Sequence, residues 1–521
     1  MRFIYLLIIV FSFGTLKAQN YKQIASYAFE SGLGIEAEIK APSNEEIKSI
    51  IDFNASEGLA PAIGKYLPFK NELQNNWNYH LSSGLYFSQI TIKSKGAKAL
   101  SLFLNQVKID ENEQFLIFNK NFQKVFGPYS LKNLYNQKQM QTPPLMGDEI
   151  SILFLSPQGN LSNSKLSIEE IGYFFENTES VSKLKAGNLG ASGPCEVNVN
   201  CDENNNFRNQ QRSIVHIYSN RNGIVGDCSG TLINNTLQDE KPYILTAFHC
   251  GEVTSNVLAD SMSFTRWVFM FNYETPTCIF NGNSDSAFDD DFVTGSWVRA
   301  GSYDNGGDNG SDFLLLELLN PVPVEFNAYF AGWDRRNIAP QSGVCLHHPS
   351  GDVKKVSTLI APATSGKYSN RENSHWIVYW KETANGHGVT ERGSSGSALF
   401  NQDGNLVGVL TGGFASCSRP NDEDFYGKFS LSWDSMGTSD WIQLKPWLDP
   451  NSSNVEIQNG KNQLLTNSKI VNNNLFKIYP NPGRDLIYLE SELEIKQIEI
   501  LDINGKTLVL LNNYYSLAGI N

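Results

Sequence analysis

Basic residues are scarce in this chain relative to acidic ones. Its 521 residues include 41 Lys and Arg against 54 Asp and Glu, which gives a formal net charge of −13. A protein dedicated to binding nucleic acid would carry a basic patch or a basic domain, so this balance argues against that function. With 40% hydrophobic and 18% charged residues, the composition is that of a globular protein, and the length predicts about three domains.

Long apolar runs are also missing, apart from one at the amino terminus. Arg2 is followed by an apolar run to about Phe13, and the small residue Ala18 precedes Gln19. That pattern predicts a signal peptide over residues 1–18, and the run is too short to span a bilayer. We therefore expect an exported protein without a transmembrane segment.

Cysteine is absent from the first 194 residues and from every position after Cys417. The seven cysteines in between form no Cys-x-x-Cys pair, and Cys195 and Cys201 lie too far apart for a zinc knuckle. Seven cysteines in an exported protein therefore predict disulfide bonds with one thiol left over.

Changes in composition divide the remaining chain into four segments. The segment before the cysteines alternates apolar and polar residues, as at Ile90–Lys93, has a turn signal at Gly127-Pro128, and is predicted to be β-rich. We interpret it as a pro-region, with an accessory β domain as the alternative. The segments are the pro-region (19–185), the cysteine-bearing block (186–455), an Asn-rich linker (456–475) and a small β module (476–521) with a turn at Asn504-Gly505.

Short apolar segments separated by turn signals fill the cysteine-bearing block, which predicts an all-β fold of sandwiched sheets or closed barrels. Asp403-Gly404 predicts a hairpin. Helical spacing predicts a C-terminal helix over Ser439–Leu448, which Pro446 would bend or end early. The clearest strand candidates are Tyr243–Ala247, Phe313–Leu318, Leu406–Thr411 and Lys428–Trp433.

Two local motifs carry residues suited to chemistry. In Leu245–Cys250 a predicted strand runs directly into His249, and in Gly393–Ser397 a serine, Ser395, lies in a glycine-flanked turn. Such a turn can aim backbone N–H groups at one point, which is the geometry of an oxyanion hole. A serine becomes a nucleophile only with a neighbouring base, and a histidine can supply it.

The histidine of such a pair needs a carboxylate to orient it. Asp312 is the best candidate, because it directly precedes the apolar run Phe313–Leu316, where an acid without a partner would be costly. The structural alternatives are a strand-end Asp312, a turn Ser395 and a packed His249.

These motifs make the block resemble the trypsin-like (chymotrypsin-fold) serine proteases and, more narrowly, the bacterial lysyl endopeptidases. The resemblance covers about residues 190–455. It rests on Gly193–Cys195, Leu232–Thr236, Leu245–Gly251, Ser311–Phe313, Ala331–Arg336, His347–Pro349, Gly388–Ser397 and Trp447–Pro450.

The resemblance implies a chymotrypsin-like double β-barrel with a C-terminal helix, in which His249 is the base, Asp312 orients it and Ser395 is the nucleophile. It also implies an oxyanion hole formed by the backbone N–H groups of Gly393 and Ser395. The implied disulfides are Cys195–Cys417, Cys201–Cys278 and Cys228–Cys250, which leaves Cys345 as the odd thiol. No metal and no organic cofactor is implied.

The resemblance further implies cleavage after lysine, with Asp424 as the carboxylate that receives the lysine side chain; Asp422 and Glu423 are close alternatives. The pocket wall would include Gly412 and Gly413. Lysyl endopeptidases carry a histidine before this glycine pair, where this chain has Thr411. A mixed preference for lysine and arginine is therefore the alternative specificity.

The neighbourhood of Ser395 also bears on activation. The residue before it is Ser394, so the ion pair that activates trypsin has no equivalent, and we expect self-cleavage near Lys185 to remove a pro-region that assists folding. His347-His348 and the acidic run Asp285–Asp291 are read as structural residues and a solvated loop rather than as metal sites.

The last segment resembles the C-terminal sorting domain of type IX (Por) secretion through Ile478–Pro482. Such domains usually run further, so we expect a truncated module. The resulting prediction is a secreted serine endopeptidase that acts on proteins and peptides and uses the type IX machinery. A catalytically silent binding or adhesin module on the same fold is the alternative from another class.

Overall fold

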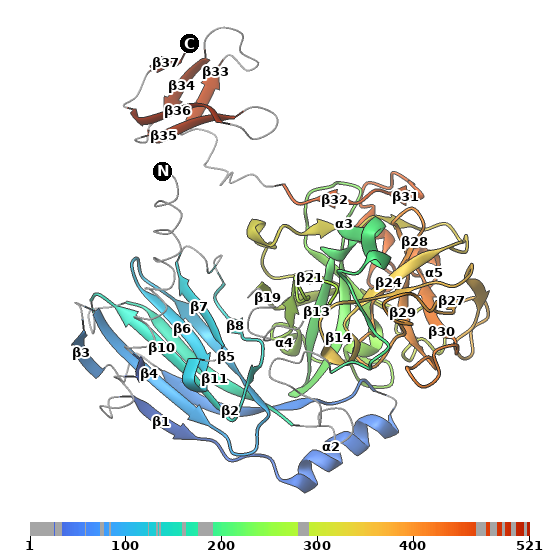
Figure 1. The fold of residues 1–521 in the computed structure, drawn as a ribbon, viewed down its shortest axis with the longest axis horizontal. Helices are drawn as coiled ribbons and strands as arrows, with labels where there is room; N and C mark the ends of the chain where they lie inside the picture. The colour runs from blue at the N-terminus through green and yellow to red at the C-terminus, as the bar shows by residue number, and fades with distance from the viewer. Residues whose placement is uncertain are drawn as a thin grey trace. The chain divides into compact units, whose positions relative to one another are not determined.

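The computed structural model describes most of the chain between Ile35 and Leu464 and short strands beyond it (Figure 1). The predicted signal peptide, Lys185 and residues 285–290 lie outside the described residues. The described ranges are 25–26, 34–57, 59–72, 78–82, 85–122, 124–131, 134, 137–158, 163–175, 191–279, 291–464 and the strands after residue 475.

The leader consists of two β-sheets that share one apolar core. Alternating residues of the first sheet, such as Ile90, Ile92 and Ile152, meet Leu102 and Ile168 of the second, and all five are buried. The first sheet contains β1 (Ile35–Glu38), β3 (Asn78–Ser82), β4 (Leu85–Lys93), β6 (Gln114–Asn119), β7 (Val125–Ser130) and β10 (Glu149–Ser156). The leader strands of the second are β2 (Gly64–Glu72), β5 (Ala99–Lys108), β8 (Met140–Gln141), β9 (Leu145–Met146) and β11 (Lys165–Phe174).

Two features of the leader differ from simple strand and turn patterns. Gly127-Pro128, predicted as a turn, lies inside β7 instead, since β7 pairs with β6 through a register shift at this point. A helix, α2 (Asn44–Ser56), begins at Ser43, whose side chain accepts a hydrogen bond from the Glu46 N–H.

The first sheet of the cysteine-bearing block continues the second leader sheet. Its strands are buried almost completely, because the sequence supplies continuous apolar runs such as Phe313–Leu316. Tyr243–Ala247 and Phe313–Leu318 form strands with the predicted bounds. The strands of the block in this sheet are β13 (Ile214–Arg221), β14 (Ile224–Ile233), β15 (Tyr243–Ala247), β18 (Val268–Met270), β19 (Phe292–Thr294), β20 (Ser296–Gly301) and β21 (Phe313–Leu318).

The second sheet of the block contains ten strands in the described residues. The predicted hairpin is present, with Gly404 at φ +76° between β28 and β29. The strands are β12 (Val197–Asn198), β23 (Trp333–Asp334), β24 (Gly343–His347), β25 (Lys355–Thr358), β26 (Thr364–Gly366), β27 (His375–Val378), β28 (Ala398–Asn401), β29 (Leu406–Gly413), β30 (Asp424–Lys428) and β31 (Ile457–Gln458).

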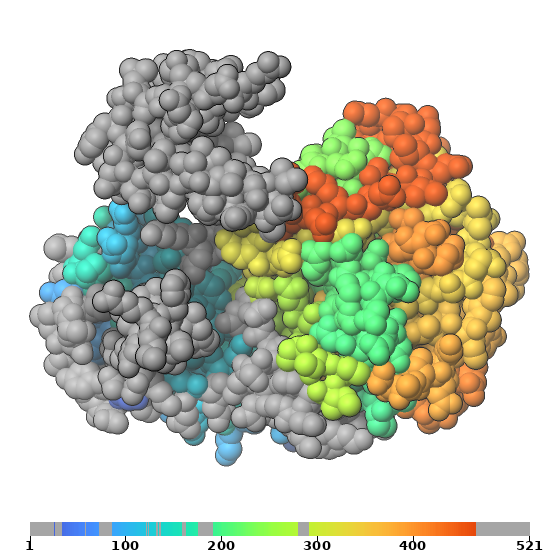
Figure 2. All heavy atoms as spheres, turned by 45° about the horizontal axis from the view of Figure 1, so that its top comes forward, coloured from blue at the N-terminus to red at the C-terminus, as the bar shows by residue number. Residues whose placement is uncertain are grey.

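Short helices and isolated strand pairs complete the block. Gln210 donates a hydrogen bond to the Gly404 carbonyl at 2.9 Å, and Figure 2 shows the green start of the block against its orange, later part. The remaining elements are α3 (Arg208–Gln211), α4 (Ser261–Phe264), the pair β16 (Glu252–Thr254) and β17 (Val257–Leu258), and the pair β22 (Tyr329–Phe330) and β32 (Lys461–Asn462).

The end of the block departs from the predicted elements. Residues expected as a strand over Lys428–Trp433 form a helix, α5 (Phe429–Asp434), because β30 ends at Lys428. The expected helix over Ser439–Leu448 is divided into a single 3₁₀ turn, Asp440–Ile442, and α6 (Lys445–Leu448). Pro446 lies in the first turn of α6, where its missing N–H costs no hydrogen bond.

Residues 1–463 form one compact unit and residues 464–521 another. The linker expected from residue 456 starts later, since β31 and β32 pair with β23 and β22 of the block. The second unit contains β33 (Phe476–Tyr479), β34 (Ile487–Ser491), β35 (Ile495–Leu501), β36 (Thr507–Tyr514) and β37 (Ala518–Ile520). Among the described residues, no helix is long and apolar enough to cross a membrane.

Candidate active site

Strand pairing brings His249 and Asp312 together. Ala247, the last residue of β15, lies opposite Phe313, the first residue of β21. The residues just outside this antiparallel pair are therefore neighbours. The His249 ring nitrogen Nδ1 lies 2.7 Å from Asp312 Oδ2, and the His249 backbone N–H donates to Asp312 Oδ1 at 3.1 Å.

Asp312 is held by its backbone as well as by its carboxylate. The side chain is fully buried and the backbone has a φ of +51°, a left-handed conformation that aspartate adopts more readily than most residues. Its N–H donates to Asp304 Oδ2 at 2.8 Å, and its carbonyl accepts from the Phe248 N–H. These bonds fix the carboxylate under the imidazole, so that Nδ1 carries the proton and Nε2 is the basic nitrogen.

Two opposing effects act on the pKa of His249. Burial lowers it, but the charge and hydrogen bond of Asp312, with a smaller contribution from Glu252, raise it above its usual value. The imidazole is thus a stronger base than an ordinary histidine, as a group that must accept a proton from a serine requires.

Ser395 lies in a turn that only glycine allows at two positions. Gly393 has φ +85° and Gly396 has φ +83°. A Cβ on Gly396 would lie 2.1 Å from Thr246 Oγ1 and 2.7 Å from the Ala247 nitrogen. The turn can therefore approach the end of β15 closely, just before His249.

Strand β14 fixes the turn from the other side. The Ser229 N–H donates to the Ser395 carbonyl at 2.8 Å, and the Ser229 hydroxyl donates to the Gly393 carbonyl at 2.9 Å. Within the described part of the chain, no hydrogen bond joins the Ser395 hydroxyl to the imidazole. Such bonds are often long in enzymes without substrate and tighten when substrate binds.

Some backbone amides of this turn donate a hydrogen bond to another described residue, and others do not. The N–H groups of Ser394, Gly396 and Ser397 donate to the Glu391, Leu410 and Ser394 carbonyls. The amides of Gly393 and Ser395 donate to no group among the described residues. They are the two donors that an oxyanion hole requires beside the serine.

A cavity of about 540 Å³ opens beside Ser395. Gly412 and Gly413 form part of its wall, as predicted for a substrate pocket. Thr411 is not among the described residues that line it: its hydroxyl bonds the Nε2 of His375 at 3.1 Å instead. The remaining lining residues are Pro61, Ile63, Asp227, Ser350, Thr390, Glu391, Arg392, Ser395, Leu410, Ala415 and Ser416.

Asp424 lies beneath one wall of this cavity. Its carboxylate accepts hydrogen bonds from Trp380 Nε1 at 2.6 Å, Thr390 Oγ1 at 2.7 Å and the Ala415 N–H at 3.2 Å. A Cβ on Gly413 would come within 1.8 Å of Asp424 Oδ1, so a side chain there would fill the space above the carboxylate. Burial raises the pKa of Asp424 to about 6, although the hydrogen bonds lower it.

The neighbouring acids do not share this environment. Asp422 is half-buried, with 39% of its side chain exposed, and pairs with Arg419 at 3.3 Å. A buried carboxylate that a cation can reach gains far more from pairing than an exposed one. Asp424 is therefore better suited than Asp422 to receive a cationic side chain.

Three disulfides tie the block together, and they are the pairs that the resemblance implied. Cys195–Cys417 joins its two ends, Cys201–Cys278 anchors an early turn, and Cys228–Cys250 fixes β14 beside the residue after His249. Each such bond contributes about 2–4 kcal/mol to stability. Cys345 is a free, fully buried thiol whose pKa burial raises to about 12.

His347 and His348 support the serine turn. His347 Nδ1 lies 2.7 Å from Ser394 Oγ, and His348 Nδ1 lies 2.9 Å from the Asp352 carbonyl. Burial, with a contribution from Lys355, lowers the pKa of His347 to about 3, so this ring stays neutral at neutral pH.

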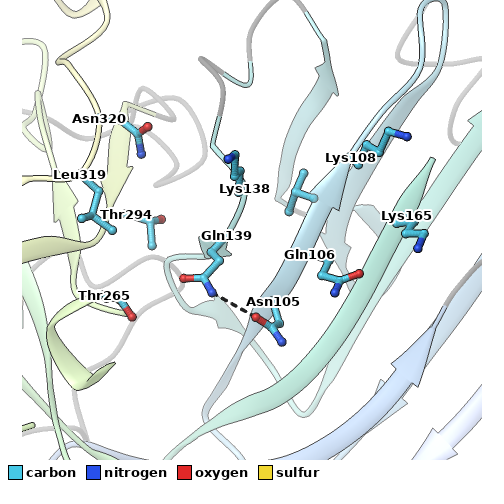
Figure 3. A pocket seen from close by; sticks show the side chains of 11 residues that line it. Asn105, Gln106, Lys108, Lys138, Gln139, Lys165, Thr265, Thr294, Leu319 and Asn320 are labelled. Carbon is cyan, nitrogen blue, oxygen red and sulfur yellow. Dashed lines mark hydrogen bonds between the residues drawn. The ribbon is translucent and has the colours of Figure 1, made fainter. Parts of the chain in front are cut away.

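A larger cavity, of about 710 Å³, lies between the leader and the block (Figure 3). Lys108, Lys138 and Lys165 line its leader side, and Thr265 and Thr294 line the other. Among the described residues that line it, there is no carboxylate and no serine or cysteine. The residues that the sequence predicts for catalysis lie elsewhere, with Ser395 in the smaller cavity.

Some residues of the site gave no signal in the sequence. Asp304 bonds the Asp312 backbone, His375 bonds Thr411, and Pro61 and Ile63 of the leader line the cavity. His375, Pro61 and Ile63 owe their position to contacts between distant segments, whereas Asp304 lies eight residues before its partner Asp312. A single sequence reveals such contacts only when a motif marks both partners.

The two sheets define the class of the block: an all-β fold with a His–Asp pair at the end of one sheet and a glycine-flanked serine beside the other. Residues 189–427 match the family model described as lysyl endopeptidase, C-terminal domain, and residues 477–518 match the secretion system C-terminal sorting domain. Residues 189–427, a little under half of the chain, are thus similar to the lysyl endopeptidase C-terminal domain, and the match to the sorting domain indicates a protein secreted by the type IX system.

The chain is also similar to a curated relative and, over part of its length, to solved structures. A lysyl endopeptidase of Pseudomonas aeruginosa is 28% identical over 316 residues, which cover 57% of this chain and 63% of that protein. The protease Anisep of Arthrobacter nicotinovorans is 14% identical, with a TM-score of 0.31 over 42% of this chain and 91% of that one. The HtrA-type protease AlgW is 16% identical, with a TM-score of 0.29 over 44% and 60%.

Proposed function

We propose that this protein is a secreted serine endopeptidase that hydrolyses peptide bonds after lysine. The observation that carries the proposal is the position of Ser395, on a turn with two unused amides, beside the bonded pair of His249 and Asp312. The cavity next to Ser395, with Asp424 beneath its wall, supports lysine as the preferred side chain.

In the proposed reaction, Ser395 Oγ attacks the carbonyl carbon of the scissile bond while His249 Nε2 takes its proton. The amides of Gly393 and Ser395 stabilise the negative oxygen that forms. His249 then gives the proton to the leaving amine, which departs and leaves an acyl group on Ser395. A water molecule, deprotonated by His249, then attacks the ester carbon; the bond to Ser395 Oγ breaks, the acid product leaves, and His249 returns the proton to Ser395 Oγ.

Specificity follows from the charge of Asp424. A lysine ammonium that enters the pocket pairs with the carboxylate, and the paired charge keeps Asp424 ionised. A neutral side chain would leave a buried polar group without a new partner, which costs about 2–5 kcal/mol. Arginine carries the same charge in a flatter, larger group, so mixed preference remains the alternative specificity.

The leader and the last segment complete the proposal. Residues 1–18 act as a signal peptide, residues 19–185 as a pro-region removed by self-cleavage near Lys185, and the last segment engages the type IX machinery. Neither a metal ion nor an organic cofactor takes part in the proposed reaction.

Peptide mapping tests this function. A denatured protein is digested with the secreted enzyme or its Ser395→Ala variant, and every cut is read by mass spectrometry. Cuts confined to lysine bonds, and absent with the variant, are expected. Cuts after lysine and arginine would establish the mixed preference, and no cuts by correctly processed protein would favour the silent binding module.

A further inference from the structure

The larger cavity, between the leader and the block, gathers three lysines of the second leader sheet (Figure 3). Lys165 of β11 lies directly opposite Lys108 of β5. On the other side of β5, the Val107 N–H donates to the Lys138 carbonyl at 2.9 Å. The three lysines therefore come from three adjacent segments of the leader and line one cavity.

The lysine side chains lie on the face of the sheet that is turned away from the leader core. Successive side chains of a strand point to opposite faces. Val107 and Leu166 are buried, whereas their neighbours Lys108 and Lys165 are exposed, as is Lys138. Lys108 and Lys165 thus form a cross-strand pair of like charge, an arrangement that destabilises a sheet.

These three positive charges have no partner in the described part of the chain. None of the three side chains has a hydrogen bond or an ion pair with a described residue, and no carboxylate is among the described residues that line the cavity. Asp110, two residues after Lys108, accepts a hydrogen bond from the Asn163 N–H at 2.9 Å instead. In a chain with a net charge of −13, such a group of lysines is suited to hold an anion.

Neutral polar side chains face the lysines from the block. Thr265, Thr294 and Asn320 line that side of the cavity (Figure 3). The Thr294 hydroxyl donates to the Gln141 carbonyl of the leader at 3.0 Å. The Asn320 amide makes no hydrogen bond to a described residue, so it is free to donate to a ligand. A ligand held from both sides would join the leader to the block.

The charge of the lysines indicates which anion fits. Lysine binds phosphate oxygens as a point charge, and two linked phosphate groups carry about −3 at neutral pH, which matches three ammonium groups. A long polyanion or an anionic membrane would also meet the acidic remainder of the protein surface. The charge balance therefore favours a small ligand with two phosphate groups.

We propose that this cavity binds a small soluble ligand through a diphosphate group, with Lys108, Lys138 and Lys165 on one side and Asn320 on the other. This site is separate from the proposed protease function and does not depend on it. A ligand that contacts both the leader and the block stabilises the chain in which the two are joined.

Isothermal titration calorimetry with pyrophosphate tests the proposal on the full-length Ser395→Ala chain, in which self-cleavage is excluded. The buffer has constant ionic strength and no divalent cation. We expect one ligand per chain, a dissociation constant in the micromolar range, and binding at least about tenfold tighter than that of orthophosphate. No saturable binding, or equal constants for the two anions, would overturn the proposal.

Substitution of the lysines separates a built site from general attraction. Lys108→Gln, Lys138→Gln and Lys165→Gln should each weaken pyrophosphate binding about tenfold. Without ligand, Lys108→Gln should not lower the thermal unfolding midpoint, because it removes a cross-strand repulsion. Unchanged binding in all three variants, or a lower midpoint in Lys108→Gln, would overturn the proposal.

A triple variant of other lysines is the matched control for the triple variant of the cavity. Lys48, Lys95 and Lys120 are exposed and lie elsewhere on the leader, so their replacement by glutamine changes the net charge equally. It should alter the dissociation constant by less than about twofold, and a loss equal to that of the cavity variant would overturn the site.

Two further measurements test the bridge and the source of the ligand. Asn320→Ala should weaken binding about threefold, and an unchanged constant would overturn the contact with the block. Vesicles that contain a polyprenyl diphosphate lipid should bind more weakly than pyrophosphate. Tighter binding to the vesicles would assign the cavity to a membrane lipid and overturn the soluble ligand.

Discussion

The two sheets of the block contribute to one site by different physical means. The first sheet places His249 and Asp312 through strand register, because β15 and β21 end side by side. The second sheet contributes Asp424 at the start of β30, while Ser395 lies on a turn shaped by Gly393 and Gly396. Regular strand pairing therefore positions the first half of the site, His249 and Asp312. The second half, Ser395 and Asp424, depends on glycine turns and on hydrogen bonds to buried side chains.

This difference shows where each half is sensitive. A strand pair tolerates small changes, because many backbone hydrogen bonds hold the two strands together. A buried carboxylate with three donors, or a turn with two left-handed glycines, depends on single groups. Substitutions that remove one group at a time should therefore separate the contributions of the two halves of the site.

Ser395→Ala should have the largest effect, because it removes the bond-forming atom. We expect kcat to fall by about 10⁵-fold or more, with substrate binding largely retained. Ser394→Ala is the matched control: it removes a hydrogen bond to His347 and should lower stability more than activity. Comparable losses in the two variants, measured with a lysyl ester, would contradict the role of Ser395.

Asp312→Asn removes the charge that orients His249 but keeps the shape of the side chain. The amide cannot hold the same tautomer of His249, so we expect kcat to fall by about 10⁴-fold at pH 7. Asp308→Asn, in the same loop but with its carboxylate accepting a hydrogen bond from the Asn305 side chain, should change kcat little. A loss of less than tenfold in Asp312→Asn would remove this residue from the proposed machinery.

Asp424→Asn tests the specificity element of the second half. The expected loss of about 2–5 kcal/mol lowers kcat/KM for lysine substrates by about 30- to 4,000-fold, whereas norleucine substrates should be affected far less. Asp422→Asn, at a neighbouring acid that pairs with Arg419 instead, is the control that should behave as wild type. Equal effects on lysine and norleucine substrates would show that Asp424 does not discriminate between substrates by the charge of their side chains.

A fall in pH should weaken the preference for lysine that Asp424 provides, by a smaller factor than the substitutions above. The pKa of Asp424 is raised to about 6, so its carboxylate is charged above that pH and loses its charge as pH falls through it. Protonation of His249 affects lysyl and norleucyl esters alike. The ratio of their kcat/KM values should therefore drop about tenfold between pH 7 and pH 5, and a constant ratio would refute the pairing.

Sequence patterns predicted the first half better than the second. Tyr243–Ala247 and Phe313–Leu318 are continuous apolar runs, and burial on both sides made their bounds readable. Lys428–Trp433 has a similar composition, yet only Lys428 lies in the strand and the rest forms α5. Short apolar runs fit a buried helix as well as a strand.

Local motifs found His249 and Ser395, because each lies in a short, distinctive segment. Asp304 escaped notice because no motif marks it, although it lies eight residues before Asp312, and His375 because it acts through Thr411, 36 residues further along the chain. The leader residues Pro61 and Ile63 are the extreme case, because nothing near them in the sequence marks a cleft more than 300 residues away.

The central claim is that His249 activates Ser395, and a small organophosphate measures this most directly. The processed secreted enzyme is treated with diisopropyl fluorophosphate and examined by intact-mass and peptide mass spectrometry, beside a His249→Ala variant. The account predicts one adduct, on Ser395, that forms at least about a thousandfold more slowly in the variant. No adduct, an adduct on another residue, or equal rates in both proteins would contradict it.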